Sequence, residues 1–286
     1  MNRILTLCLM FTASPLFALS TYNIGNSLTN DGLGHGTLFQ GEITNGLEYM
    51  ADFYDKDLTL GYHVDGSQNL ISIWNTPAGV EGIDAVREPF GTWDNALPNY
   101  KWDTVLLQPH LTGNSTFASD KEMIGNFINY TRTNLENQDT TFYVYQTWPR
   151  PSWGNYSDFW ESASPDLPTT PSRTKREYYS NLMEDLDEVY TPQGIAVRMI
   201  PTGEVLNRLS KLADQFLLPN NRTMADFYRD DIHMQYTLGR YTAAATIFST
   251  LFQQDITDLI PESFYDANLL TPEMYQLINA TVWDVV

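Results

Sequence analysis

Short, mostly apolar runs recur along the chain, and five of them predict buried β-strands. The run at 102–108 is the clearest, because a nearly continuous apolar stretch is typical of a strand covered on both faces of a parallel sheet. A strand at 21–24 leads directly into a tight Gly25-Asn26-Ser27 turn. The remaining predicted strands span residues 58–64, 141–148 and 195–201.

Helical spacing of apolar residues separates these strands. Ile43, Leu47, Met50 and Tyr54 illustrate it, because they fall on one face of a helix. Helices are predicted at 39–54, 119–135, 173–190, 204–216 and 238–252, with a last helix opening at Thr271-Pro272-Glu273. Strands that alternate with helices predict a five-stranded parallel sheet in a three-layer α/β/α sandwich.

Three stretches are predicted to be loops. Residues 29–36 are rich in glycine, so we expect an exposed, mobile loop beside Ser27. Prolines and glycines make 76–100 mainly a loop. The connection from Pro149 to about Pro171 is long enough to indicate a functional insertion.

The first twenty residues have the pattern of a secretory signal peptide. Asn2 and Arg3 give a short basic start, an apolar stretch follows, and Ala18-Leu19-Ser20 places small residues before a cut. We therefore expect a signal peptide at 1–20, cleavage near Ser20, and a single domain at 21–286 in a secreted or periplasmic protein. The single cysteine, Cys8, lies inside the predicted signal, so an ordinary core must supply the stability.

The net charge of −19 narrows the choice of partners. Such a surface repels nucleic acid and anionic lipid, so neither is expected as a partner, and no membrane span is predicted after the signal. Seven Trp and seventeen Tyr residues could give a secreted protein flat surfaces for sugar rings, although most would be expected in the core.

Ser27 and the downstream segment Asp230-Asp231-Ile232-His233 carry the candidate chemistry. A serine hydroxyl becomes a useful nucleophile when a neighbouring base takes its proton, and histidine does this near neutrality. A carboxylate three residues before the histidine can fold back and orient its ring. The structural alternatives are a helix N-cap for Asp230 or Asp231 and a packed histidine at a helix start.

These two blocks resemble the first and last motifs of the SGNH (GDSL-like) hydrolase superfamily, whose fold is flavodoxin-like. The resemblance implies that Ser27 is the nucleophile, His233 the general base and Asp230 its orienting residue. It also implies an oxyanion hole that includes the backbone N–H of Ser27 and of Gly66. The family's Gly-x-Asn-Asp motif is absent, which leaves Gln108, slightly favoured, and Asn114 as candidates for the remaining donor.

Four other residues are candidate substrate contacts: His110, Trp148, Arg150 and Trp153. For the last three, a loop that is packed by its own aromatic side chains is an equally good explanation. Neither a metal nor a cofactor is predicted, because His35, His63 and His110 are scattered. The expected function is a secreted serine esterase for short acyl esters, with acetyl groups on a polysaccharide favoured. The alternatives are a lipase or thioesterase for longer chains, and a glycan-binding or acyl-transferring protein on the same fold.

Overall fold

The computed structural model describes residues 18–33, 46–77, 84–109, 115–153, 155–161, 174–260 and 270–286. Within these residues, the chain forms an α/β sandwich around one sheet with the order β3-β2-β1-β4-β5-β6. The predicted five-stranded parallel sheet is confirmed. Its strands are β1 (Leu19–Gly25), β2 (Leu58–Asp65), β4 (Thr104–Leu107), β5 (Thr141–Tyr145) and β6 (Val197–Ile200).

A sixth strand extends the sheet beyond the prediction. β3 (Asp84–Val86) pairs antiparallel with β2, and α4 (Trp93–Asn99) follows it. Both lie in the stretch 76–100, which was predicted to be mainly loop. A strand of three residues is too short to show an alternating pattern, and Pro98 inside the last turn of α4 disguises that helix.

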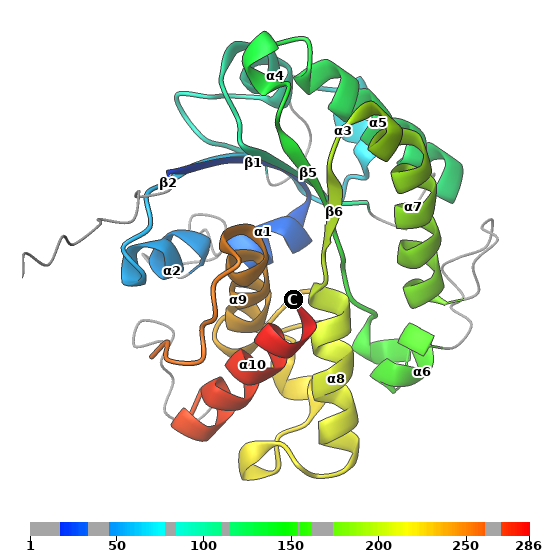
Figure 1. Ribbon diagram of the computed structural model, residues 1–286. Helices are drawn as coiled ribbons and strands as arrows, with labels where there is room; N and C mark the ends of the chain where they lie inside the picture. Colours follow the sequence, from blue (N-terminus) through cyan, green and yellow to red (C-terminus); the bar gives the residue numbers. More distant parts are fainter. Residues whose placement is uncertain are drawn as a thin grey trace, which may run out of the picture.

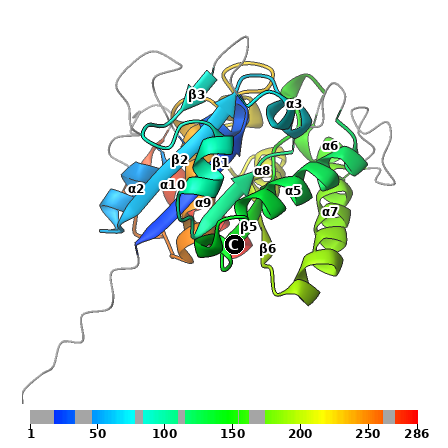
Figure 2. The same cartoon turned by 90° about the horizontal axis from the view of Figure 1, so that it is seen from above.

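Helices cover both faces of the sheet (Figures 1 and 2). One layer contains α1 (Ser27–Leu33), α2 (Leu47–Phe53), α8 (Thr202–Asp214), α9 (Leu238–Phe252) and α10 (Pro272–Val285). The other contains α3 (Leu70–Asn75), α4, α5 (Phe117–Thr131) and α7 (Lys175–Tyr190). The short helix α6 (Tyr156–Glu161) packs against α7 and α8.

The stretch after Ser27 is a helix and not the exposed loop expected at 29–36. Residues 28–33 of α1 are all buried, while 34–36 lie outside the described residues. Gly32 explains the difference, because a Cβ built there would lie 2.5 Å from Cδ1 of Ile247 on α9. This glycine therefore permits close packing of two helices.

The start of β1 includes the last residues of the predicted signal peptide. Leu19 and Ser20 pair with Leu58 and Thr59 of β2. The N–H and the hydroxyl of Ser20 each donate to Oδ2 of Asp103, at 2.8 Å. Cleavage after Ser20 would therefore remove these bonds from the strand.

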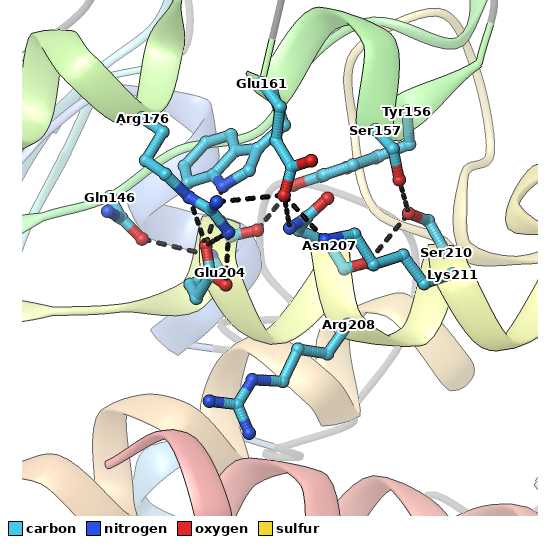
Figure 3. A network of polar contacts seen from close by, with 12 residues as sticks. Gln146, Tyr156, Ser157, Glu161, Arg176, Glu204, Asn207, Arg208, Ser210 and Lys211 are labelled. Atoms are coloured by element: carbon cyan, nitrogen blue, oxygen red, sulfur yellow. Dashed lines mark hydrogen bonds and ion pairs between the residues drawn. The ribbon is translucent and has the colours of Figure 1, made fainter.

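A polar cluster holds α6, α7 and α8 together beside the end of β5 (Figure 3). Oε2 of Glu204, on α8, accepts from the indole of Trp160 at 2.7 Å, and Oε1 accepts from Nη2 of Arg176 at 2.6 Å. Nη1 of the same arginine lies 2.9 Å from Oε1 of Glu161. The N–H of Glu204 donates to Oε1 of Gln146, which follows β5, at 3.1 Å.

Replacing Arg176 with Gln should lower the free energy of unfolding by about 1–2 kcal/mol, because charge-assisted hydrogen bonds to two carboxylates are lost from a half-buried site. Arg208→Gln is the matched control on α8. Arg208 points away from the cluster in Figure 3 and pairs with the exposed Asp284, so its change should stay within about 0.5 kcal/mol. Equal losses in urea denaturation would contradict a stabilising role for the cluster.

Candidate active site

Ser27 occupies the central carboxyl edge of the sheet. Only Asn26 separates it from the end of β1, and it is the first residue of α1. β1 lies between β2 and β4, with Gly25 opposite Val64 and Ile24 opposite Leu107. Because parallel strands end at the same edge, the segments that follow β2 and β4 flank the serine on both sides.

The predicted serine, histidine and aspartate come together. Oγ of Ser27 lies 2.9 Å from Nε2 of His233. Nδ1 of His233 lies 2.8 Å from Oδ2 and 3.0 Å from Oδ1 of Asp230. With the proton on Nδ1 donated to the carboxylate, Nε2 is left to accept the serine proton.

Backbone hydrogen bonds fix the Asp230 carboxylate within its own loop. Oδ1 accepts from the N–H of Ile232 at 2.9 Å and of His233 at 2.8 Å. Partial burial raises the pKa of the Asp230 carboxyl, but the hydrogen bonds from His233 and Ile232 outweigh it and leave the pKa below its usual value. The group is therefore a carboxylate at neutral pH, as an orienting residue requires.

Gln108 shapes the turn that carries the serine. Its Oε1 accepts from the N–H of Asn26 at 2.9 Å, and from the N–H and hydroxyl of Thr29 at 3.2 and 2.8 Å. Gly25 makes this approach possible, because a Cβ there would lie 2.6 Å from the same oxygen. The amide of Gln108 is thus held in one orientation, with only 1% of the residue exposed.

Three predicted oxyanion-hole donors remain unpaired. Within the described parts of the chain, neither the N–H of Ser27 nor that of Gly66 has an acceptor, and Nε2 of Gln108 is buried without a partner. The neighbouring N–H groups of Asn26 and Leu28 are both paired. The other candidate, Asn114, lies outside the described residues.

The predicted substrate contacts are placed differently from one another. Trp148 is only 1% exposed, and its indole donates to the carbonyl of Ile232 at 2.7 Å, so it supports the histidine loop from below the surface. Arg150 lies nearer the surface, with Nη1 3.7 Å from Oδ2 of Asp231. Trp153 ends the 3₁₀ helix η3 (Pro151–Trp153); its side chain, like all of His110, lies outside the described residues.

A pocket of about 160 Å³ borders the histidine loop. The Tyr228 hydroxyl donates to the Pro149 carbonyl at 2.8 Å, and the Ser152 N–H donates to Oδ1 of Asp231 at 3.0 Å, so one wall is bonded directly to that loop. The walls are mostly apolar or aromatic, with one cation: Pro149, Arg150, Pro151, Tyr156, Met224, Ala225 and Tyr228.

Other candidate chemistry is sparse. Across the described residues, no three His, Cys, Asp or Glu side chains gather as a metal site would require. His63 is buried, and its Nδ1 accepts from the Trp93 N–H at 3.3 Å; His35 lies outside the description. In the same part of the chain, no helix has the length and apolar character needed to cross a membrane.

Two polar residues near the serine were missed in the sequence. Asn26 binds the loop after β2, with Nδ2 donating to the Gln68 carbonyl at 2.8 Å. Asp31 lies one turn after Ser27 and accepts from Nη1 of Arg229 at 2.8 Å. The only signal in the sequence is that both are polar in a stretch that follows a buried strand directly.

Comparisons with known proteins place this geometry in context. Residues 20–273 match the protein family described as Domain of unknown function (DUF4886), and no match was found among curated proteins. A DUF4886 family protein from Bacteroides uniformis is 18% identical with a TM-score of 0.60, covering 94% of this chain and 95% of its own. This likeness confirms the α/β fold.

Two further structures are more distant. A candidate GDSL-like lipase from Parabacteroides merdae is 12% identical with a TM-score of 0.48, covering 82% of this chain and 96% of its own. The lipase Lip_vut3 from a goat rumen metagenome is 12% identical with a TM-score of 0.43, covering 80% of this chain and 96% of its own.

Replacing Gln108 with Leu should lower the free energy of unfolding by about 2–4 kcal/mol, because three buried donors lose their acceptor. Thr29→Val is the matched variant, because it removes one of these three donors and introduces no charge, so its loss should be smaller. Urea denaturation compares the two. A Leu variant as stable as Thr29→Val would show that Oε1 does not hold the turn.

Proposed function

The chain belongs to the DUF4886 family, and we propose that it is a serine esterase that hydrolyses short acyl esters through an acyl-enzyme on Ser27. One observation carries this proposal: Ser27, His233 and Asp230 are joined in series by contacts of 2.9 and 2.8 Å. An isolated histidine packed at a helix start would have no reason to meet both groups.

The first half of the proposed reaction forms the acyl-enzyme. Oγ of Ser27 bonds to the ester carbonyl carbon while its proton passes to Nε2 of His233. The carbonyl electron pair moves to the oxygen, where the N–H groups of Ser27 and Gly66 and the amide of Gln108 are the proposed donors. The bond to the alcohol oxygen then breaks, and that oxygen leaves with the proton from His233.

The second half releases the acyl group. A water molecule gives a proton to Nε2 of His233 as its oxygen bonds to the acyl carbon. The resulting oxyanion collapses, the bond to Oγ breaks, and Ser27 recovers its proton. The carboxylate of Asp230 stabilises the imidazolium in both halves. No metal or cofactor takes part in this scheme.

Ser27, Asp230 and His233 do not themselves line the pocket beside the histidine loop, and the proposal is that the acyl group extends into it from Ser27. Its size suits a short acyl group or a single ring better than a long acyl chain. At about 160 Å³ it is close to the ~150 Å³ of a cavity that accepts benzene. The hydroxyls of Tyr228 and Tyr156 are already used, donating to the carbonyls of Pro149 and Gly203. The pocket therefore offers mainly apolar walls, with Arg150 as its cation.

The proposed natural substrate is an acetyl ester on a polysaccharide outside the cytoplasm. The support is the signal-like sequence at 1–20, with its predicted cleavage near Ser20, and the high Trp and Tyr content. In this setting the protein is secreted or periplasmic, and its partners are ester substrates.

A fluorophosphonate probe tests the activated serine. Covalent label should appear on Ser27 by peptide mass spectrometry, and His233→Ala should slow labelling by at least about 10³-fold, since the base is lost. Asp230→Asn should also slow it, because the wrong tautomer is favoured. His63→Gln is the control, because His63 lies outside the site and its loss should leave the rate of labelling unchanged. A folded wild-type protein without label at Ser27 would overturn the proposal.

The acyl preference can be measured with p-nitrophenyl esters of increasing chain length. The acetate should give the highest kcat/KM, because the neighbouring pocket is small. A preference for long acyl chains would favour a lipase or thioesterase instead. Binding of an acetylated polysaccharide without release of acetate would favour a binding protein.

Gln108→Glu tests the proposed oxyanion donor separately from the turn. The glutamate keeps an oxygen for Asn26 and Thr29 but replaces the free amide donor with a second oxygen. We expect kcat for p-nitrophenyl acetate to fall by about 10²–10³-fold, as loss of one such donor typically does. An unchanged kcat in the folded variant would transfer this role to another residue, with Asn114 as the next candidate.

A further inference from the structure

Asp31 connects the helix that carries the serine with the loop that carries the histidine. It lies on α1, four residues after Ser27, and its side chain is fully buried. Oδ1 accepts from Nη1 of Arg229 at 2.8 Å, and Oδ2 accepts from the N–H of Met234 at 2.8 Å. One carboxylate therefore holds residues on both sides of the segment 230–233.

Arg229 closes the same loop from within. Its N–H donates to the carbonyl of His233 at 3.0 Å, and its Nη1 donates to the carbonyl of Met234 at 2.6 Å. Its Nε lies 3.9 Å from Oδ2 of Asp230. Tyr228 and Met234 also form an isolated antiparallel bridge. Movement of Arg229 would thus be passed directly to Asp230 and His233.

A second arginine, on α9, pairs with the buried carboxylate of Asp31. Nε of Arg240, on α9, donates to Oδ1 of Asp31 at 3.1 Å. The ring of Tyr236 contacts both guanidinium groups, with centroid distances of 4.8 Å to Arg229 and 4.9 Å to Arg240. Burial lowers the pKa of Arg240 below its usual value.

Such a buried ionic group is a poor source of net stability. Desolvation of the charges offsets much of their attraction, and apolar side chains of similar volume often stabilise a core as well or better. What apolar side chains could not supply is the directed hydrogen bonding to the Met234 N–H and to Arg229. The arrangement is therefore better explained by the position that it imposes on the loop.

We propose that Asp31 is a positioning residue that sets the separation between Oγ of Ser27 and Nε2 of His233. The inference rests on the proposed esterase function. Ser27 begins α1 and Asp31 lies one turn further along the same helix, so the helix is a rigid spacer between the nucleophile and the anchor of the histidine loop. Trp148, in the segment after β5, also restrains that loop through its hydrogen bond to the Ile232 carbonyl.

Asp31→Asn is the first variant, because it preserves shape but turns one acceptor into a donor that faces other donors. We expect kcat for p-nitrophenyl acetate to fall by about 10²-fold with KM unchanged, since small misplacements of reacting groups cost about that much. Phe127→Leu, in the core of the opposite layer, serves as the control for lost stability. It should lower the Tm while kcat stays at the wild-type value.

Proton NMR distinguishes a positioning role from a merely structural one. A loss of stability alone would leave the signal of the Nδ1 proton of His233 unchanged. The Nδ1 proton shared by His233 and Asp230 should give a far-downfield signal in the wild type, assigned by its loss in His233→Ala. The signal should be shifted or lost in Asp31→Asn and retained in Phe127→Leu. A folded Asp31→Asn protein with wild-type kcat and an unmoved signal would overturn the proposal.

A second pair of variants covers the case in which Asp31→Asn does not fold. Arg229→Gln leaves the Asp31–Arg240 ion pair and the bond from the Met234 N–H in place but removes the guanidinium that ties Asp31 to the loop, whereas Arg240→Gln keeps that guanidinium. We expect the larger loss of kcat in Arg229→Gln; equal kcat values in the two variants would overturn the proposal. Failure of the wild-type protein to label at Ser27 would instead overturn the esterase function itself.

Discussion

The position of β1 between two parallel neighbours is the constraint on which the site depends. The register that places Gly25 opposite Val64 and Ile24 opposite Leu107 brings three distant chain segments to one sheet edge. Ser27, Gly66 and Gln108 each follow the end of one of these strands. Their proximity is therefore a property of the sheet, and each loop has only to set local details.

Hydrogen-bond acceptors then fix the conformation of the backbone around the turn between β1 and α1. Oε1 of Gln108 satisfies the N–H groups of Asn26 and Thr29, while Asp31 receives the N–H of Met234. These buried oxygens hold the backbone around the serine without taking up the N–H of Ser27 or of Gly66, the proposed oxyanion donors. A preorganised site needs this division, because donors already committed to the fold could not stabilise a developing oxyanion.

The sequence was informative wherever a pattern was long or a residue type was chemically distinctive. Buried parallel strands show as apolar runs, and Ser27 with Asp230 and His233 shows as two spaced motifs. The strand β3 and the buried state of α1 were missed, because three residues show no period and Gly32 resembles a loop residue until Ile247 is seen beside it. Asp31 was missed because its partners lie about 200 positions away.

Local charge in the site runs against the charge of the whole protein. The net charge of −19 disfavours a developing anion at long range, but screening limits that effect to about a Debye length. At short range, Arg229 and Arg240 both pair with the buried carboxylate of Asp31, which places two cations beside the Asp230–His233 loop. Nε of Arg229 also lies 3.9 Å from Oδ2 of Asp230. Partial burial raises the pKa of the Asp230 carboxyl, but the hydrogen bonds from His233 and Ile232 lower it below its usual value. The two arginines thus balance the charges of Asp31 and Asp230 beside the serine, where the N–H groups of Ser27 and Gly66 are the proposed oxyanion donors.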